Sequence, residues 1–391
     1  MKEVVIVSAK RTAIGTFNGM YKNVSAKELA KTVMKAVVEE SNVPPEAIDE
    51  IIVGNVDQSS AFSNVGRIAA LELGFPEKIS AHTVGQNCAS GMQALVNGIQ
   101  AIKSGDAETI LVVGTENMSQ IPHLLKGTRS GYRLGHHQVT DKIVEMLHDP
   151  FVDMTMGETA EVVAEEHGIT REEQDAFALR SHERALQAQR DGVFAKEIVS
   201  VTATKRRETV TLQEDEGPNE RTSLEVLSTL RTAFKKDGTI TPGNACGLND
   251  GAAAALIMSR EKADELGVKP IARIVANASV GVDPKRMGLG PAYAVPKVLE
   301  KAGLTMEDID LVELNEAFAA QALACVKQLE LDPEKVNPFG GAIALGHPVG
   351  TTGLRLIVTL LNGLQHFEKK RGIATLCVGG GIGGAVIVER V

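Results

Sequence analysis

Three residues far apart in this 391-residue chain carry side chains suited to nucleophilic and acid–base chemistry. Cys88 lies in a short stretch of small and polar residues, His347 lies in a glycine-rich turn, and Cys377 ends an apolar segment. A thiolate is a strong nucleophile, a neutral imidazole can take a thiol's proton, and a second thiol can act as a general acid or base near neutral pH. If the fold brings the three together, they predict covalent catalysis through Cys88.

The surroundings of Cys88 favour a reactive thiol. Residues 79–84 predict a short strand, and the apolar residues between Met92 and Ile102 recur at helical spacing. Cys88 would therefore lie near a helix N-terminus, where unpaired N–H groups and the helix dipole favour the thiolate. The alternative is that Cys88 is buried as a small hydrophobic residue, as single cysteines often are.

His347 and Cys377 also have plainer alternatives, as a surface-loop histidine and as a buried strand cysteine. The glycines after Cys377 would expose backbone N–H groups that could stabilise an oxyanion. Residues 379–384 also contain Gly-x-Gly-x-x-Gly, the pattern of dinucleotide-binding loops. That fingerprint must open a helix, whereas residues 385–388 predict another strand, so we exclude a dinucleotide site.

Weaker candidates lie elsewhere. Asn315 follows a predicted strand, and its amide could hold a water or a carbonyl oxygen, although Asn315 and Glu316 could instead only favour a helix N-terminus. Cys246 lies in a glycine-punctuated turn and could touch a substrate. Cys325 shares an apolar helical face with its neighbours, so we expect it in the core.

The order of the predicted elements indicates an α/β fold made of two similar halves. The first 118 residues alternate strands and helices, which predicts a parallel sheet covered on both faces. The same order of elements begins again at residue 271, whereas the segment between carries clustered charges and few clear strands. A duplicated fold would place equivalent turns near one another, including those of Cys88 and His347. The expected units are residues 1–118 with 250–270, an inserted loop domain of residues 119–249, and residues 271–391.

Composition excludes several classes of protein. The net charge of −9 argues against nucleic-acid binding, which needs a concentrated basic face. The run Lys205-Arg206-Arg207 fits a solvated surface better than a phosphate site. No apolar run is long enough to cross a membrane and no signal peptide is evident, so we expect a cytoplasmic protein. The four cysteines and nine histidines show no disulfide or metal-ligand spacing, so we expect neither disulfides nor a metal.

Four motifs, in order along essentially the whole chain, closely resemble those of the thiolases. They are Asn87-Cys88-Ala89-Ser90-Gly91, Asn315-Glu316-Ala317-Phe318-Ala319, Gly340-Gly341-Ala342-x-Ala344-Leu345-Gly346-His347-Pro348-x-Gly350 and Cys377-x-Gly379-Gly380-Gly381-x-Gly383. The resemblance implies duplicated α/β/α/β/α layers of two mixed-sheet halves with an inserted loop domain. It also implies coenzyme A thioesters as substrates, without a metal or redox cofactor.

The resemblance further implies a role for each motif. Cys88 would accept the acyl group, and His347 would activate Cys88 and bind the thioester oxygen together with a water held by Asn315. Cys377 would move a proton to or from the second substrate, and the N–H groups of Cys88 and Gly379 would form a second oxyanion hole. Positions that match the family's pocket imply a substrate pocket of Met156, Phe234, Cys246, Leu248, Met287 and Phe318.

The function that we predict is an acetyl-CoA C-acetyltransferase of the acetoacetyl-CoA thiolase type. It would condense two acetyl-CoA to acetoacetyl-CoA and catalyse the reverse thiolysis through acyl-Cys88, with CoA released. Cys246 stands where the family usually has serine, which leaves acyl-chain length open, so a degradative 3-ketoacyl-CoA thiolase with longer substrates is one alternative. A non-catalytic acyl-CoA-binding or redox-sensing protein is another. The resemblance also implies a homodimer or homotetramer.

Overall fold

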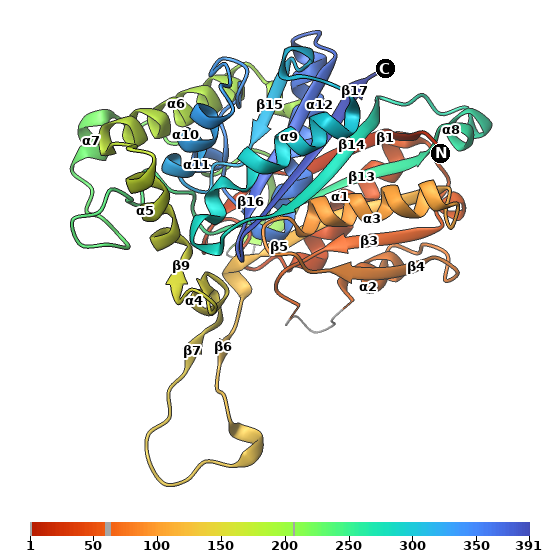
Figure 1. The fold of residues 1–391 in the computed structure, drawn as a ribbon. Coiled ribbons are helices and arrows are strands. Elements are labelled where there is room, and N and C mark those ends of the chain that lie inside the picture. Colours follow the sequence, from red (N-terminus) through yellow and green to blue (C-terminus); the bar gives the residue numbers. More distant parts are fainter. Residues whose placement is uncertain (1, 59–63, 206–207) are drawn as a thin grey trace.

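The computed structural model describes residues 2–58, 64–205 and 208–391, and a large mixed β-sheet runs through it (Figure 1). Across the sheet, the strand order is β15 (Leu311–Leu314), β16 (Arg371–Val378), β17 (Ile382–Arg390), β14 (Ala272–Gly281), β1 (Val4–Thr12), β13 (Asn249–Ser259), β5 (Thr109–Asn117), β3 (Glu50–Gly54) and β4 (Ser80–Val84). Two short strands, β2 (Gly15–Thr16) and β10 (Ile198–Val199), pair with β13 and β1.

The two halves of this sheet have the same topology. On one side, β3 is parallel to β5, β5 is antiparallel to β13, and β13 is antiparallel to β1. On the other side, β15, β16, β17 and β14 repeat these directions in the same order. The halves meet where β1 pairs antiparallel with β14, at Val5 opposite Arg273 and Ile6 opposite Ala272. The predicted duplicated α/β fold is therefore confirmed, whereas the exact domain boundaries stay a prediction.

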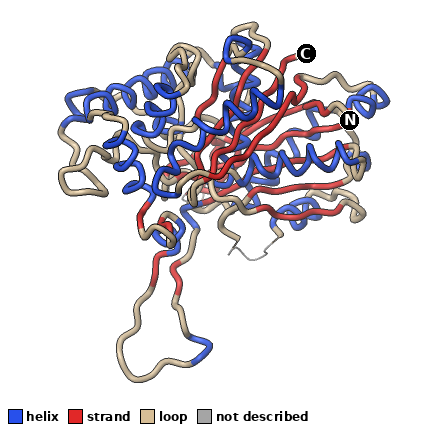
Figure 2. The backbone as a smooth tube through the Cα atoms, viewed as in Figure 1, coloured by secondary structure: helices blue, strands red, loops and turns tan. Residues whose placement is uncertain are grey.

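Two helices form the middle layer: α3 (Ser90–Ser104) packs on strands of the first half and on α12 (Val349–His366), and α12 packs on strands of both halves. Figure 2 shows the helices in blue against the strands in red. Every residue of α12 from Val349 to Leu364 is buried, as expected for a helix that is apolar on nearly all sides. The N-terminal ends of the two helices approach closely at glycines. A Cβ on Gly353 would lie 2.6 Å from the Met92 backbone nitrogen, so only glycine fits there. This contact places the turns that precede the two helices side by side.

Further helices cover the outer faces of the sheet. One half is covered by α1 (Ala26–Ser41) and α2 (Val65–Glu72), and the other by α9 (Gly290–Ala302) and α10 (Ala319–Gln328). The helix α8 (Arg260–Leu266) connects the halves. Helix α1 begins after Ser25, whose hydroxyl caps it by accepting a hydrogen bond from the Glu28 N–H. The result is the layered arrangement that the sequence indicated.

The chain between β5 and β13 forms a separate cluster of elements beside the sheet (Figure 1). It contains β6 (His123–Leu124), β7 (Thr140–Asp141), α4 (Lys142–Met146), β8 (His148–Asp149), β9 (Met154–Thr155), α5 (Met156–Glu166), α6 (Arg171–Arg190), β11 (Val201–Lys205), β12 (Glu208–Leu212) and α7 (Leu224–Ser228). Helix α11 (Ala342–Leu345), from the second half, packs on α6. Of the basic run at 205–207, Arg206 and Arg207 lie outside the described residues.

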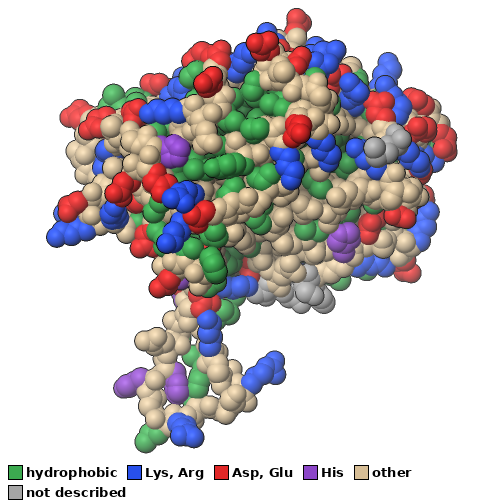
Figure 3. All heavy atoms as spheres, viewed as in Figure 1, with side chains coloured by type: hydrophobic (Ala, Val, Ile, Leu, Met, Phe, Trp, Pro, Cys, Tyr) green, Lys and Arg blue, Asp and Glu red, His purple; other side chains and the backbone are tan. Residues whose placement is uncertain are grey.

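An arm of residues 123–141 projects from this cluster, and Figure 3 shows basic and histidine side chains along it. Several apolar side chains of the arm are exposed, and Leu134 is fully so. Among the described residues, no helix is long and apolar enough to span a bilayer.

Candidate active site

A cavity of about 450 Å³ lies where the middle-layer helices, the sheet and the inserted cluster meet, and it is lined by Cys88, His347 and Cys377. Gly379 lines it as well. The structure thus brings together three turns that are separated by up to 289 positions in the chain. All six residues of the predicted substrate pocket also line this cavity: Met156, Phe234, Cys246, Leu248, Met287 and Phe318.

The Cys88 turn links the end of β4 to the start of α3, as the sequence predicted. Ser90 stabilises the turn, because its hydroxyl donates to the Asn87 carbonyl oxygen (2.7 Å) and accepts from the Gln86 N–H (2.9 Å). Asn87 has φ +44°, a left-handed conformation that asparagine tolerates better than most residues. This tight geometry leaves Cys88 only partly buried, facing the cavity.

The prediction that Cys88 is a thiolate is wrong for the free protein. Helix α3 begins at Ser90 with Ala89 as its N-cap, so Cys88 lies outside the helix. Burial raises the pKa of the Cys88 thiol, and the N–H groups of Gly379 and of Cys88 itself, which donate toward the sulfur, oppose that rise only in part. At neutral pH the sulfur is a thiol and needs a base.

His347 has the properties of that base. The turn that carries it is anchored by a 2.9 Å hydrogen bond from the His347 N–H to Asn249 Oδ1. Gly346 has φ +108°, and a Cβ there would lie 2.5 Å from Asn249, so the turn requires glycine. Burial, with a smaller contribution from the positive charge of Arg355, lowers the pKa of His347 to about 3. The imidazole is therefore neutral, and its Nε2 has no hydrogen-bond partner among the described residues.

Cys377 lies near the end of β16 and is 1% exposed. Burial, followed by the neighbouring thiols Cys88, Cys325 and Cys246, raises the pKa of Cys377 well above its ordinary value. The glycine turn that follows leads into β17, not into a helix, which agrees with the exclusion of a dinucleotide site. Cys246 also faces the cavity, and burial raises its pKa to about 12.

Asn315 is not among the described residues that line the cavity, unlike the other predicted catalytic positions. It is completely buried just after β15, and neither atom of its amide has a hydrogen-bond partner in the described part of the chain. Buried polar atoms usually have a hydrogen-bond partner, and those without one are rare in proteins. The amide thus has free capacity to bind a water or a substrate oxygen.

Glu316 does not cap the following helix, which was one alternative for this motif. Its carboxylate accepts hydrogen bonds from Ser181 Oγ (2.6 Å), Asn337 Nδ2 (2.8 Å) and the Ile343 N–H (3.2 Å). It therefore joins the Asn315 loop to α6 and to the chain that leads to His347. Cys325 lies in the core, as predicted, and is 0% exposed.

Glu116, at the end of β5, supports the His347 turn and was missed from the sequence. Its carboxylate accepts hydrogen bonds from Asn55 Nδ2 (2.9 Å) and from the N–H groups of Val56 (2.9 Å), Asp57 (3.0 Å) and Gly350 (3.0 Å). Burial raises the pKa of Glu116 to about 7. The only available signal was an acidic residue at the end of an apolar strand. The inserted cluster also contributes cavity-lining residues that the sequence did not indicate, Val144 and Leu147.

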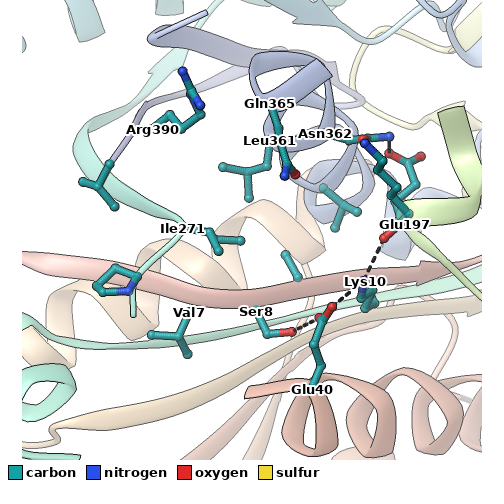
Figure 4. A pocket seen from close by; sticks show the side chains of 15 residues that line it. Val7, Ser8, Lys10, Glu40, Glu197, Ile271, Leu361, Asn362, Gln365 and Arg390 are labelled. Carbon is teal, nitrogen blue, oxygen red and sulfur yellow. Dashed lines mark hydrogen bonds and ion pairs between the residues drawn. The ribbon is translucent and has the colours of Figure 1, made fainter. Parts of the chain in front are cut away.

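A second cavity, of about 440 Å³, lies between β1 and α12 (Figure 4). Two of the charged groups that line it pair with each other, since Glu40 binds Lys10 (2.7 Å), and Glu40 also accepts a hydrogen bond from Ser8 Oγ (2.6 Å). The described residues that line it include no thiol and no imidazole. The nucleophilic chemistry is therefore concentrated in the first cavity.

Known proteins resemble this chain over its whole length. Residues 4–261 match the thiolase N-terminal domain and residues 268–390 the thiolase C-terminal domain. An acetyl-CoA acetyltransferase of Chromobacterium violaceum is 49% identical, covering 99% of this chain and 100% of the relative. A probable acetyl-CoA acyltransferase of Staphylococcus aureus is 47% identical over all of both chains.

Solved structures agree with the sequence relatives. The Bacillus anthracis acetyl-CoA acetyltransferase has a TM-score of 0.98 at 48% identity, covering 100% of this chain and 99% of that one. Human mitochondrial 3-ketoacyl-CoA thiolase has a TM-score of 0.97 at 41% identity, with the same coverage. The duplicated sheet, the cavity that joins two thiols and a histidine, and these full-length matches lead to one conclusion. This chain belongs to the thiolase family.

Proposed function

We propose that the protein is an acetyl-CoA C-acetyltransferase that condenses two acetyl-CoA into acetoacetyl-CoA and catalyses the reverse thiolysis. The observation that carries the proposal is the single cavity lined by Cys88, His347 and Cys377. The full-length relatives named acetyl-CoA acetyltransferase support the choice of substrate.

In the first half-reaction, the Cys88 thiol loses its proton to His347 Nε2, and the sulfur attacks the carbonyl carbon of acetyl-CoA. The imidazole is neutral in the free protein because its pKa is lowered to about 3, and it can hold the proton because that pKa rises when an anion forms beside it. The carbon–sulfur bond to CoA then breaks, and CoA leaves with a proton from the Cys377 thiol. The products are acetyl-Cys88 and free CoA, as in ping-pong catalysis.

In the second half-reaction, the Cys377 thiolate takes a proton from the α-carbon of a second acetyl-CoA. The resulting carbanion attacks the carbonyl carbon of acetyl-Cys88 and forms the new carbon–carbon bond. The bond to Cys88 sulfur breaks, and the sulfur regains its proton from His347. The high pKa of Cys377 suits this role, because a weak acid makes a strong base once it is ionised.

Hydrogen-bond donors around the cavity support the stabilisation of oxyanions. We assign the N–H groups of Cys88 and Gly379 to one oxyanion hole, since both already donate toward the Cys88 sulfur. We assign His347 Nε2, together with a water held by the Asn315 amide, to the other. Every step is assigned to a side chain or a backbone group, so the proposal calls for no metal or redox cofactor. Full activity after dialysis against a chelator would support that part.

A 3-ketoacyl-CoA thiolase with longer substrates is the second candidate. The cavity is lined mostly by apolar side chains, among them Met118, Val144 and Leu147, which could contact an acyl chain. Thiolysis of 3-ketoacyl-CoAs of increasing chain length separates the candidates. A maximal rate with the four-carbon substrate supports the first, and a maximum at longer chains supports the second.

We also propose a homodimer or homotetramer. The strand β4 is at the edge of the sheet, where its outer N–H and C=O groups could pair with a second copy. The arm of residues 123–141 exposes Leu125, Leu134 and Val139, which could be buried against another copy. Light scattering of the wild type and of a variant with a shortened arm tests this, and a monomeric wild type would contradict it.

The remaining partners and the compartment follow from the chemistry. Acetyl-CoA, acetoacetyl-CoA and CoA are the proposed small-molecule partners, and the acidic chain, with net charge −9, is not expected to bind nucleic acid. We expect no membrane partner. Because the reaction needs Cys88 and Cys377 as free thiols, we propose a reducing compartment, the cytoplasm.

Acetyl labelling tests the proposed function directly. After incubation with acetyl-CoA, mass spectrometry should find one acetyl group on the peptide that contains Cys88. Cys88→Ser should lack the adduct, and Cys377→Ala should form the adduct but fail to turn over. Cys325→Ala is the matched control, because this core thiol is a neighbour of Cys377 but does not line the cavity, and its loss should change neither result. A wild type without the adduct would instead indicate a binding or sensing protein.

A further inference from the structure

Thr352, in the first turn of α12, makes the only hydrogen bond to the His347 side chain among the described residues. Its Oγ1 lies 2.6 Å from His347 Nδ1, and both residues are buried. Helix α12 begins at Val349 after Pro348, so Thr352 lies one turn above the histidine. The same hydroxyl also lies 3.0 Å from the Pro348 carbonyl oxygen, four residues earlier. The Thr352 hydroxyl thus contacts two groups but has only one proton that it can donate.

The direction of these two hydrogen bonds decides which nitrogen of His347 carries the proton. A carbonyl oxygen can only accept, so the 3.0 Å contact with Pro348 is a hydrogen bond when Thr352 donates its single proton there. Toward His347, Thr352 can then only accept, and Nδ1 must be the donor. In the neutral imidazole one nitrogen is protonated and the other has a lone pair. With the proton on Nδ1, the lone pair is on Nε2, the nitrogen without a partner among the described residues.

We infer that Thr352 is a positioning residue that fixes His347 in its Nδ1–H tautomer, with Nε2 ready to accept the proton of Cys88. The inference rests on the proposed function for its catalytic consequence, but the tautomer itself is a property of the free protein. Without this hydroxyl, both tautomers become accessible, and the form with a proton on Nε2 cannot act as the base. Without this hydroxyl the imidazole ring also rotates more freely, because in the wild type the hydrogen bond at Nδ1 holds the ring in one orientation.

The structure offers a sharp set of variants. Thr352→Val keeps the shape of the side chain and removes the hydroxyl. The Pro348 carbonyl stays satisfied, because it also accepts from the N–H groups of Thr351 (2.9 Å) and Thr352 (3.0 Å), so His347 Nδ1 is the group that loses its partner. Thr352→Ser keeps the hydroxyl and should restore function. Thr351→Val is the matched control, because Thr351 donates to the Gly251 carbonyl oxygen (2.7 Å) and is equally buried.

The first measurement is neutron diffraction from crystals of the free protein, which locates hydrogens directly. We expect a hydrogen on His347 Nδ1 pointing at Thr352, and none on Nε2. A hydrogen on Nε2 with Nδ1 bare would overturn the inference. This result is independent of whether acetyl-CoA is the substrate.

The second measurement is the rate of acetyl-Cys88 formation after rapid mixing with acetyl-CoA. Thr352→Val should slow this step about tenfold or more, the effect of losing one hydrogen bond that orients a catalytic group. Thr352→Ser should recover most of the rate, and Thr351→Val should stay near wild type. Equal losses in both valine variants would show a general packing effect and contradict the inference, as would a wild-type rate in Thr352→Val. A wild type that forms no adduct would instead refute the proposed function.

Discussion

Asn87 Nδ2 donates a 2.9 Å hydrogen bond to the carbonyl oxygen of Gly379, across 292 positions of the chain. This bond ties the turn of the nucleophile, in the first half of the fold, to the turn after Cys377, in the second half. The neighbouring N–H of Gly379 donates toward the Cys88 sulfur. The bond therefore sets the distance between the Cys88 sulfur and the Gly379 N–H, which we assign to an oxyanion hole.

Removal of this amide should slow catalysis without disturbing the turn. Asn87→Gly accepts the left-handed backbone, φ +44°, and deletes only the side chain that holds Gly379. We expect kcat to fall about tenfold, because a misplaced donor stabilises the oxyanion less well. Asn42→Gly is the matched control, since Asn42 has φ +56° at the end of α1, away from the cavity. Steady-state thiolysis assays check both, and an unchanged kcat in Asn87→Gly would remove Asn87 from the mechanism.

The buried His347 should make the fold sensitive to mild acid. Its pKa is about 3 in the folded protein and about 6.5 when unfolded, so the unfolded chain binds more protons between these values. Stability is therefore lost as the pH falls from 6.5 toward 3. Between pH 7 and pH 5 the wild type should lose roughly 2 kcal/mol more than His347→Asn, as measured by urea unfolding. Equal losses in the two proteins would show that His347 titrates normally.

The pKa of Cys88 predicts how its alkylation depends on pH. Only the thiolate reacts with iodoacetamide, and burial raises the pKa of this thiol in the free protein. The rate at the Cys88 peptide, followed by mass spectrometry, should keep rising through pH 9. In urea the same peptide should level off near the ordinary thiol pKa of about 8.5. A plateau near pH 7 in the folded protein would instead reveal a thiolate–imidazolium pair at rest.

The chemistry of the site was predictable from sequence because it depends on residue types at the ends of elements. Cys88, His347 and Cys377 stand in or beside glycine-rich turns, and the repeated order of strands implied that two of these turns are equivalent. The charge state of Cys88 was not predictable, since the local pattern indicates the helix dipole but not the burial. Glu116 and Thr352 were missed for a related reason. Glu116 acts through a hydrogen bond to Gly350 that only the packing of β5 against α12 creates, and Thr352 acts through one to His347 that depends on how the chain enters α12.

Phe234 should limit the length of the acyl chain. Its ring lies edge-on to Phe318, with centroids 6.1 Å apart at 83°, and both rings line the cavity. The ring also covers the first turn of α5, where a Cβ on Gly157 would lie 2.2 Å from it. Phe234→Ala removes this wall, so the space that it vacates can receive additional methylene groups of a substrate.

The expected result is a change in specificity. For Phe234→Ala, the ratio of kcat/KM for an eight-carbon 3-ketoacyl-CoA to that for the four-carbon substrate should rise about tenfold, within the range that pocket methylenes contribute. Phe151→Ala is the control, because Phe151 is 84% exposed and does not line the cavity. The ratio is measured by thiolysis of the two substrates under identical conditions. If it stays at the wild-type value while Phe234→Ala remains folded, the acyl chain must leave the cavity by another side, past Val144 and Leu147.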